Sequence, residues 1–206
     1  RSEVETYVLN NESGEMEKAS EVGPFGTIPT TSLNVWFDDF EVYVNGVKHV
    51  DVYPRFEWKG GALVKNDSIG VAIPQGWQII SGQNSCQTQF KYYSNPNDSW
   101  TYGSDCGGRP ASEQTYGMSW QNLSAPIHTG DYPNFIYKGT AFFRVKKTSS
   151  SANTRFVGSY AHDASEKATS SYSVGFNWGF ISFQLNGSSS SSNKIDTAGF
   201  SKNITG

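Results

Sequence analysis

The feature that most constrains the fold is an Asn45-Gly46 pair standing between two stretches of alternating apolar and polar residues. Before the pair, Phe40, Val42 and Val44 occupy every second position, and a similar alternation follows it. Both central residues of a type I′ turn need a positive φ angle, which Asn and Gly adopt more readily than other residues. The pattern therefore predicts an antiparallel hairpin over residues 40–54.

Short segments with the composition of strands recur along most of the chain. They are rich in Val, Ile, Thr and aromatic residues and are separated by turns such as Pro74-Gln75-Gly76. Besides the hairpin, we expect strands over residues 33–37, 55–60, 62–66, 69–73, 77–81, 86–94, 135–148 (one strand or two, broken near Gly139), 155–163, 171–187 and 194–200. Residues 1–20 are expected to form an arm or a weak first strand.

No stretch shows the period of about 3.6 residues that is typical of an amphipathic helix. The chain is therefore predicted to be all-β, an antiparallel β-sandwich of the immunoglobulin-like or jelly-roll kind with long loops and little helix. A length of 206 residues suits one such domain, so residues 1–206 are read as a single domain.

Composition excludes several classes of function. Charged residues make up 17% and the net charge is −3, which argues against nucleic-acid partners because these need clustered Lys and Arg. No run of 18 apolar residues occurs, so no membrane insertion is expected. No signal peptide is recognisable, so the sequence is either that of a mature chain or a segment that omits the signal.

The two cysteines, Cys86 and Cys106, are most simply read as one disulfide. That reading places the protein in an oxidising compartment, such as the periplasm or the exterior of a cell. The alternative is a pair of buried free thiols.

A long segment that does not fit strands, residues 94–134, overlaps a cluster of aromatic residues. Rigid rings interleaved with short polar side chains suit sugars, whose C–H faces match the rings and whose hydroxyls match Asp, Asn and Arg. The predicted ligand-binding residues are Tyr92, Tyr93, Trp100, Tyr102, Asp105, Arg109 and Trp120. Two other interpretations stay open: the same composition suits protein recognition, and the rings could instead form a small core beneath the loop.

Catalytic and metal chemistry have weaker signals, and no catalytic residue, metal ligand or cofactor is predicted. The spacings of His49, His128 and His162 match no zinc motif. Asp39 and Glu41 would share one strand face about 7 Å apart, which is compatible with a pair of glycosidase carboxylates. A polysaccharide-active enzyme, or a carbohydrate-binding module of one, is therefore the alternative function.

Several features together resemble the N-terminal receptor-binding (lectin) domains of bacterial chaperone–usher fimbrial tip adhesins. The segment IYKGTAFFRVKKTSS is similar to a late strand of those domains, and the tail SKNITG (201–206) looks like the start of their linker to a pilin-type domain. One disulfide, the length and the Ser, Thr and Asn content add to the likeness.

The resemblance implies a non-enzymatic adhesin that is exported through the periplasm to the fimbrial tip. Its partners would be a host glycan or glycoprotein, and the pilin-type domain and fimbrial subunits of the full-length protein. A protein-binding surface domain without sugar recognition is a third possibility.

Overall fold

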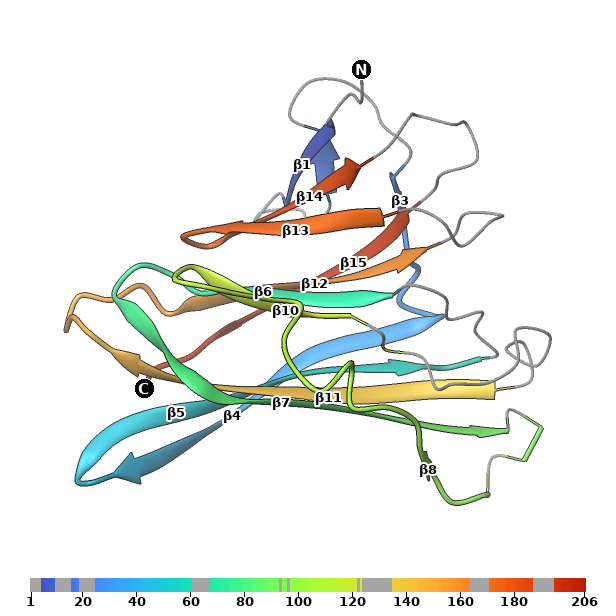
Figure 1. Cartoon of the computed structure of the whole chain (residues 1–206), viewed down its shortest axis with the longest axis horizontal. Coiled ribbons are helices and arrows are strands. Elements are labelled where there is room, and N and C mark those ends of the chain that lie inside the picture. The colour runs from blue at the N-terminus through green and yellow to red at the C-terminus, as the bar shows by residue number, and fades with distance from the viewer. Residues whose placement is uncertain are drawn as a thin grey trace.

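The described part of the chain forms three stacked β-sheets (Figure 1). The computed structural model describes residues 5–9, 16–18, 25–60, 67–92, 94–95, 97–121, 123, 135–163, 171–186 and 195–206. These residues contain no helix, and hence no helix long and apolar enough to cross a membrane. The prediction of an all-β antiparallel sandwich is confirmed.

The first layer is a five-stranded antiparallel sheet in the order β4-β5-β11-β7-β8. Its strands are β4 (Leu33–Val44), β5 (Val47–Trp58), β11 (Phe135–Lys147), β7 (Trp77–Tyr92) and β8 (Thr101–Tyr102). The Asn45-Gly46 hairpin joins β4 to β5, with φ angles of 49° and 77° at these two residues. This part of the sequence-based prediction is confirmed.

The second layer is a six-stranded sheet in the order β3-β15-β12-β6-β10-β9. Its strands are β3 (Phe25–Thr27), β15 (Ile195–Asn203), β12 (Arg155–Asp163), β6 (Ser68–Ala72), β10 (Gly117–Trp120) and β9 (Ser112–Gln114). All neighbours are antiparallel except β3 and β15, which run parallel. All five residues of β6 are buried, because this sheet is covered on both faces.

The third layer is a four-stranded sheet that the sequence did not reveal. Its order is β13-β14-β1-β2, with β13 (Ser171–Asn177), β14 (Phe180–Asn186), β1 (Glu5–Leu9) and β2 (Met16–Lys18). Val174 and Ile181 from this sheet pack against Ala72, Val157 and Ala161 of the six-stranded sheet. The first strand therefore belongs to an additional layer over the sandwich.

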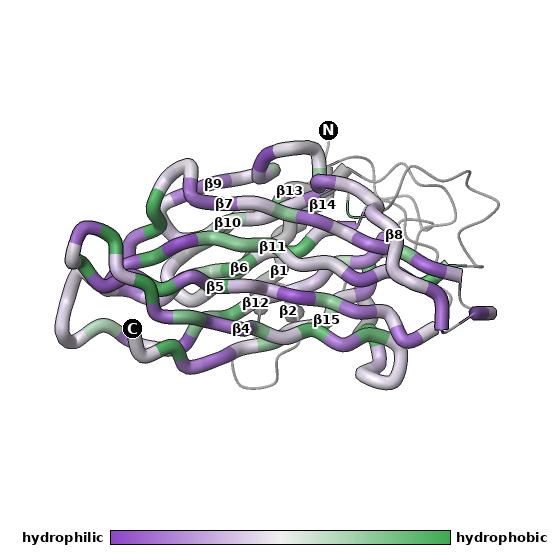
Figure 2. Tube along the Cα trace, turned by 90° about the horizontal axis from the view of Figure 1, so that it is seen from below, coloured by the Kyte–Doolittle hydropathy of each residue, from purple (hydrophilic) through white to green (hydrophobic). Residues whose placement is uncertain are grey.

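The main core lies between the five- and six-stranded sheets and is dominated by large rings. Trp120, Tyr137, Tyr160, Phe56 and Phe143 are among its largest fully buried side chains. In β11, buried and partly exposed residues alternate along the strand, as expected when one face of a sheet covers a core. None of the described strands covers the other face of the five-stranded sheet, and Figure 2 shows the strands of this sheet running side by side.

Several strand predictions differ from the structure in detail. Residues 77–81 and 86–94 were expected to be separate strands, but β7 continues from Trp77 to Tyr92 past an irregularity in its pairing with β11. Of the one or two strands expected over residues 135–148, the structure has one, and the break expected near Gly139 is wrong because β11 runs through that residue. The strand expected at residues 62–66 lies outside the described residues.

The six residues expected to begin a linker lie along the body of the domain. Residues 201–203 pair with β12, and Ile204 is buried while its N–H donates to the carbonyl of Thr154 at 2.8 Å. The expectation that a linker and a pilin-type domain follow stays a prediction.

Candidate functional site

A hollow of about 210 Å³ lies on the open face of the five-stranded sheet. We call it the outer trench, and define it by the side chains of Trp36, Arg55, Glu57, Gln87, Gln89, Lys138 and Thr140. These residues come from four adjacent strands, β4, β5, β11 and β7. Because side chains on one face of a sheet recur every second residue, each strand contributes through alternate positions.

The strand register arranges the outer trench in two neighbouring rows. In one row Trp36 lies opposite Arg55, Arg55 opposite Thr140, and Thr140 opposite Gln87. In the other row Glu57 lies opposite Lys138, and Lys138 opposite Gln89. The rows place an indole, two amides and charges of both signs on one shallow surface.

One carboxylate holds the β4 wall of the outer trench in place. Asp38 accepts a hydrogen bond from the indole N–H of Trp36 at 3.3 Å. The same carboxylate oxygen is 2.8 Å from Nε of Arg55. The pair is about one third exposed, so its net contribution to stability is small. Its consequence for the site is orientation, since two lining side chains share one anchor.

Trp100 extends the outer trench at its β7 side. Its ring lies under the Nζ atoms of Lys138 and Lys91, at 4.3 and 4.7 Å from the ring centroid. Lys138 therefore lines the trench and also supports the ring of Trp100. Tyr102, which is 56% exposed, lies across from Gln89 in the pairing of β8 with β7. Two of the predicted binding residues thus lie beside the trench.

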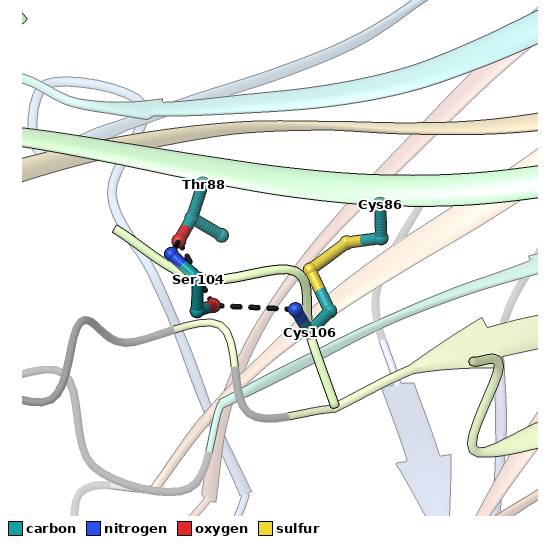
Figure 3. Close-up of a disulfide and its surroundings, with 4 residues drawn as sticks. All are labelled: Cys86, Thr88, Ser104 and Cys106. Carbon is teal, nitrogen blue, oxygen red and sulfur yellow. Dashed lines mark hydrogen bonds between the residues drawn. A yellow bond between two sulfur atoms is a disulfide. The ribbon is translucent and has the colours of Figure 1, made fainter. Parts of the chain in front are cut away.

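The disulfide attaches this aromatic segment to β7 (Figure 3). Cys86 and Cys106 are bonded, which confirms the predicted pairing. Next to the bond, the N–H of Ser104 donates to Oγ1 of Thr88 at 2.9 Å, and the N–H of Cys106 donates to Oγ of Ser104 at 3.3 Å. Backbone bonds between residues 103–104 and Thr88 add to the attachment. The position of Tyr102 follows from these contacts.

The remaining predicted binding residues lie elsewhere. Tyr92 is 53% exposed, but its ring packs against that of the buried Phe135, with the two ring centroids 4.5 Å apart. It lies on the side of the sheet opposite Lys91. Asp105 and Arg109 are exposed on the turn that follows Gly103. Tyr93 lies outside the described residues.

Trp120 is not available to a ligand. It is 1% exposed, and its ring packs in the core 6.1 Å from that of Phe143. The interpretation that some of the aromatic residues form core is therefore right for this residue. Trp120 occupies a buried position of β10, whereas Trp100 stands in a loop.

The geometry does not assemble the carboxylate pair of a glycosidase. Asp39 forms an ion pair with Lys202, and Glu41 forms one with Lys48. Both belong to the alternate set of β4 positions, on the other side from Trp36. Within the outer trench, Glu57 is the one carboxylate among the described lining residues, whereas hydrolysis by two acids needs a second.

The histidines in the described ranges have structural partners. Nδ1 of His49 lies 2.9 Å from the carbonyl oxygen of Val47. Nδ1 of His162 lies 3.0 Å from Oδ1 of the buried Asp67. The same carboxylate accepts a hydrogen bond from the hydroxyl of Tyr160 at 2.5 Å. No group of three or more potential metal ligands occurs in the described part of the chain.

The His162 imidazole has a raised pKa. Burial acts in the opposite direction, because it disfavours the charged ring, but the hydrogen bond to Asp67 and the charges of Asp67, Asp196 and Asp163 outweigh it. Trp58 contacts the His162 ring edge-on at 5.2 Å and donates its indole N–H to the Tyr160 hydroxyl at 3.2 Å. The cluster is part of the core and does not line the outer trench.

Comparisons with known proteins find likeness in structure alone. No protein-family profile matches the chain, and no curated protein sequence matches it. The collagen-binding domain of a Staphylococcus aureus adhesin matches with 12% identity and a TM-score of 0.35, over 82% of this chain and 99% of that one.

Two further matches are to larger bacterial surface proteins. The collagen-binding domain of Erysipelothrix rhusiopathiae surface protein RspB has 10% identity and a TM-score of 0.40, over 82% of this chain and 50% of that one. The pilus backbone protein RrgB of Streptococcus pneumoniae has 8% identity and a TM-score of 0.39, over 84% and 56%. At such low identities and scores, these likenesses assign neither a family nor a function to this chain.

Proposed function

We propose that this chain is a non-enzymatic adhesin domain of the bacterial cell surface that binds a glycan, free or carried on a host glycoprotein. The observation that supports the proposal is the outer trench with its neighbouring aromatic loop. Indoles at Trp36 and Trp100 match the C–H face of a sugar ring. The amides of Gln87 and Gln89 each supply donors and an acceptor for its hydroxyls.

Binding at one trench is expected to be weak. The hollow is shallow, and each hydroxyl contact nets only about 0.5–1.5 kcal/mol, because a hydrogen bond to water is lost when it forms. Many copies on one cell would raise the overall affinity through multivalency. Placement at a fimbrial tip and export through the periplasm remain predictions from the sequence resemblance.

The test is a glycan array followed by titration of each glycan that binds, using folded wild-type protein and four variants. Trp100→Ala and Gln89→Ala alter the site, and we expect each to weaken binding by at least about tenfold, the range seen for anchor residues. Tyr43→Ala is the aromatic control, since Tyr43 is 69% exposed near the hairpin turn. Gln78→Ala is the amide control, because Gln78 lies on β7 beyond the irregularity in that strand.

The outcomes separate the rival functions. Unchanged binding in both site variants would exclude the outer trench as the binding site. Binding to a host glycoprotein that survives enzymatic removal of its sugars would favour the protein-binding alternative. Release of reducing ends from a bound oligosaccharide would favour the enzyme.

A further inference from the structure

A larger cavity, of about 790 Å³, lies at the end of the molecule where connections from all three sheets meet. Its walls are the turn at 74–76 between β6 and β7, the loop at 148–154 between β11 and β12, and the turn at 178–179 between β13 and β14. We call it the end cavity. These connections gather at the left in Figure 1, whereas β8 lies at the right. The end cavity shares no lining residue with the outer trench.

Hydrogen bonds hold the three walls of the end cavity together. The N–H of Thr148 donates to the carbonyl of Gly76 at 2.8 Å, and the N–H of Gly179 donates to the carbonyl of Ile73 at 3.0 Å. The indole N–H of Trp77 donates to the carbonyl of Asn153 at 2.7 Å. Because each bond joins two different connections or layers, the cavity is already formed in the free protein.

Close packing at Gly76 fixes the wall further. Its φ angle is +92°, and a Cβ atom built there would lie 2.6 Å from the Cβ of Ala152. Only glycine fits this approach without displacement of the 148–154 loop. A cavity of this size with fixed walls falls in the range of small-ligand sites.

The lining of the end cavity is polar and apolar in similar measure, and it includes one cationic side chain among the described residues. Ser149, Ser151 and Asn153 supply hydroxyl and amide groups, and the half-buried Trp178 supplies an indole. Arg155 contributes a guanidinium group, and the described lining contains no Asp or Glu. The planar guanidinium matches a carboxylate with two parallel hydrogen bonds.

We propose that the end cavity is a second binding site, and that it takes a terminal acidic sugar. The carboxylate would bind Arg155, a C–H face of the ring would lie against Trp178, and the hydroxyls would bind Ser149, Ser151 and Asn153. An acidic peptide is less well matched, because Arg155 is the one cationic side chain among the described lining residues, whereas several acidic side chains would bring several carboxylates to it. This site is independent of the outer trench and of the function proposed for it.

Titration calorimetry with defined ligands tests the proposal. The probes are 3′-sialyllactose, a disaccharide ending in glucuronic acid, lactose, and an acetylated tripeptide of glutamate. We expect at least one acidic sugar to bind at least about tenfold more tightly than lactose, since hydrogen bonds to charged groups are worth about 1.5–3 kcal/mol and about 1.4 kcal/mol is tenfold. Which of the two acidic sugars binds indicates whether the ligand carries sialic or uronic acid.

Variants assign the binding to the cavity. Arg155→Gln should weaken binding of the acidic sugar by about tenfold to a hundredfold. Arg155→Lys should have a smaller effect, because lysine keeps the positive charge but lacks the planar guanidinium that forms two parallel hydrogen bonds. Arg109→Gln is the matched control, since Arg109 is exposed on a different turn. Trp100→Ala should leave this binding unchanged, which separates the end cavity from the outer trench.

Three outcomes of the ligand titrations would overturn the proposal: no saturable binding of either acidic sugar at millimolar concentration, equal binding of lactose, or binding of the glutamate tripeptide alone. Normal binding by a folded Arg155→Gln protein would also overturn it.

Discussion

Removal of the Cys86–Cys106 crosslink should destabilise the fold mainly through the unfolded chain. The bond closes a loop with a sequence separation of 20 residues. For a loop of that length, the chain-entropy relation gives about 3 kcal/mol at 25 °C. In the folded state the loop should stay in place, because residues 103–104 keep their hydrogen bonds to Thr88.

The measurement is urea unfolding of the double variant Cys86→Ala/Cys106→Ala beside the wild type. With a urea m-value of about 2 kcal/mol/M, a loss of about 3 kcal/mol lowers the midpoint by about 1.5 M. The m-value should rise, since a chain without the crosslink exposes more surface when it unfolds. Wild-type protein reduced with a thiol is the control, because it keeps both sulfur atoms and loses only the bond. A loss below about 1 kcal/mol in both samples would refute the reasoning.

Two further changes test the core. Gly139→Ala should lower the free energy of unfolding by about 1–3 kcal/mol, because its Cβ would lie 2.3 Å from Cε1 of Phe56. Urea unfolding measures this loss. An unchanged unfolding midpoint would mean that the Phe56 ring moves aside freely. The raised pKa of His162 should make stability depend on pH: its contribution is complete below the unfolded value of about 6.5 and is lost as pH rises through the higher folded value. Unfolding at pH 6 and pH 8.5 should therefore show a decline with pH that is smaller in His162→Gln, and equal slopes in the two proteins would contradict this role.

Local sequence signals predicted the elements whose cause is local. The Asn45-Gly46 turn needs a conformation that these two residues adopt readily, so the hairpin followed from the sequence. The break expected at Gly139 failed because the reason for glycine there is not a bend. The residue lies opposite Phe56 in the pairing of β11 with β5, and the ring occupies the space of a side chain.

The third sheet and the outer trench could not be predicted because their causes are long-range. β1 pairs with β14, so a strand near residue 5 is defined by a partner near residue 185. The outer trench joins Trp36, Gln89 and Lys138, which are far apart in sequence and meet only once the strand register is known. Strand periodicity does place residues 87 and 89 on one face, but it does not say which strands lie beside them.

Trp100 and Trp120 show the limit for single residues. Both stand in the same aromatic segment, yet one lies beside the outer trench and the other is in the core. Trp120 follows Gly117, Met118 and Ser119 in a strand that pairs with β6, inside the sandwich. Composition alone does not distinguish a ring for contact from a ring for packing.

The place of β15 has a consequence for the order in which the protein can fold. This strand, the last in the described chain, lies between β3 and β12 and pairs with both. A ribosome makes β12 more than thirty residues before β15, so one edge of β12 has unpaired N–H and C=O groups until residues 195–203 emerge. The nascent chain is thus open to mispairing with its neighbours, and we expect cooperative folding of this domain to wait for β15.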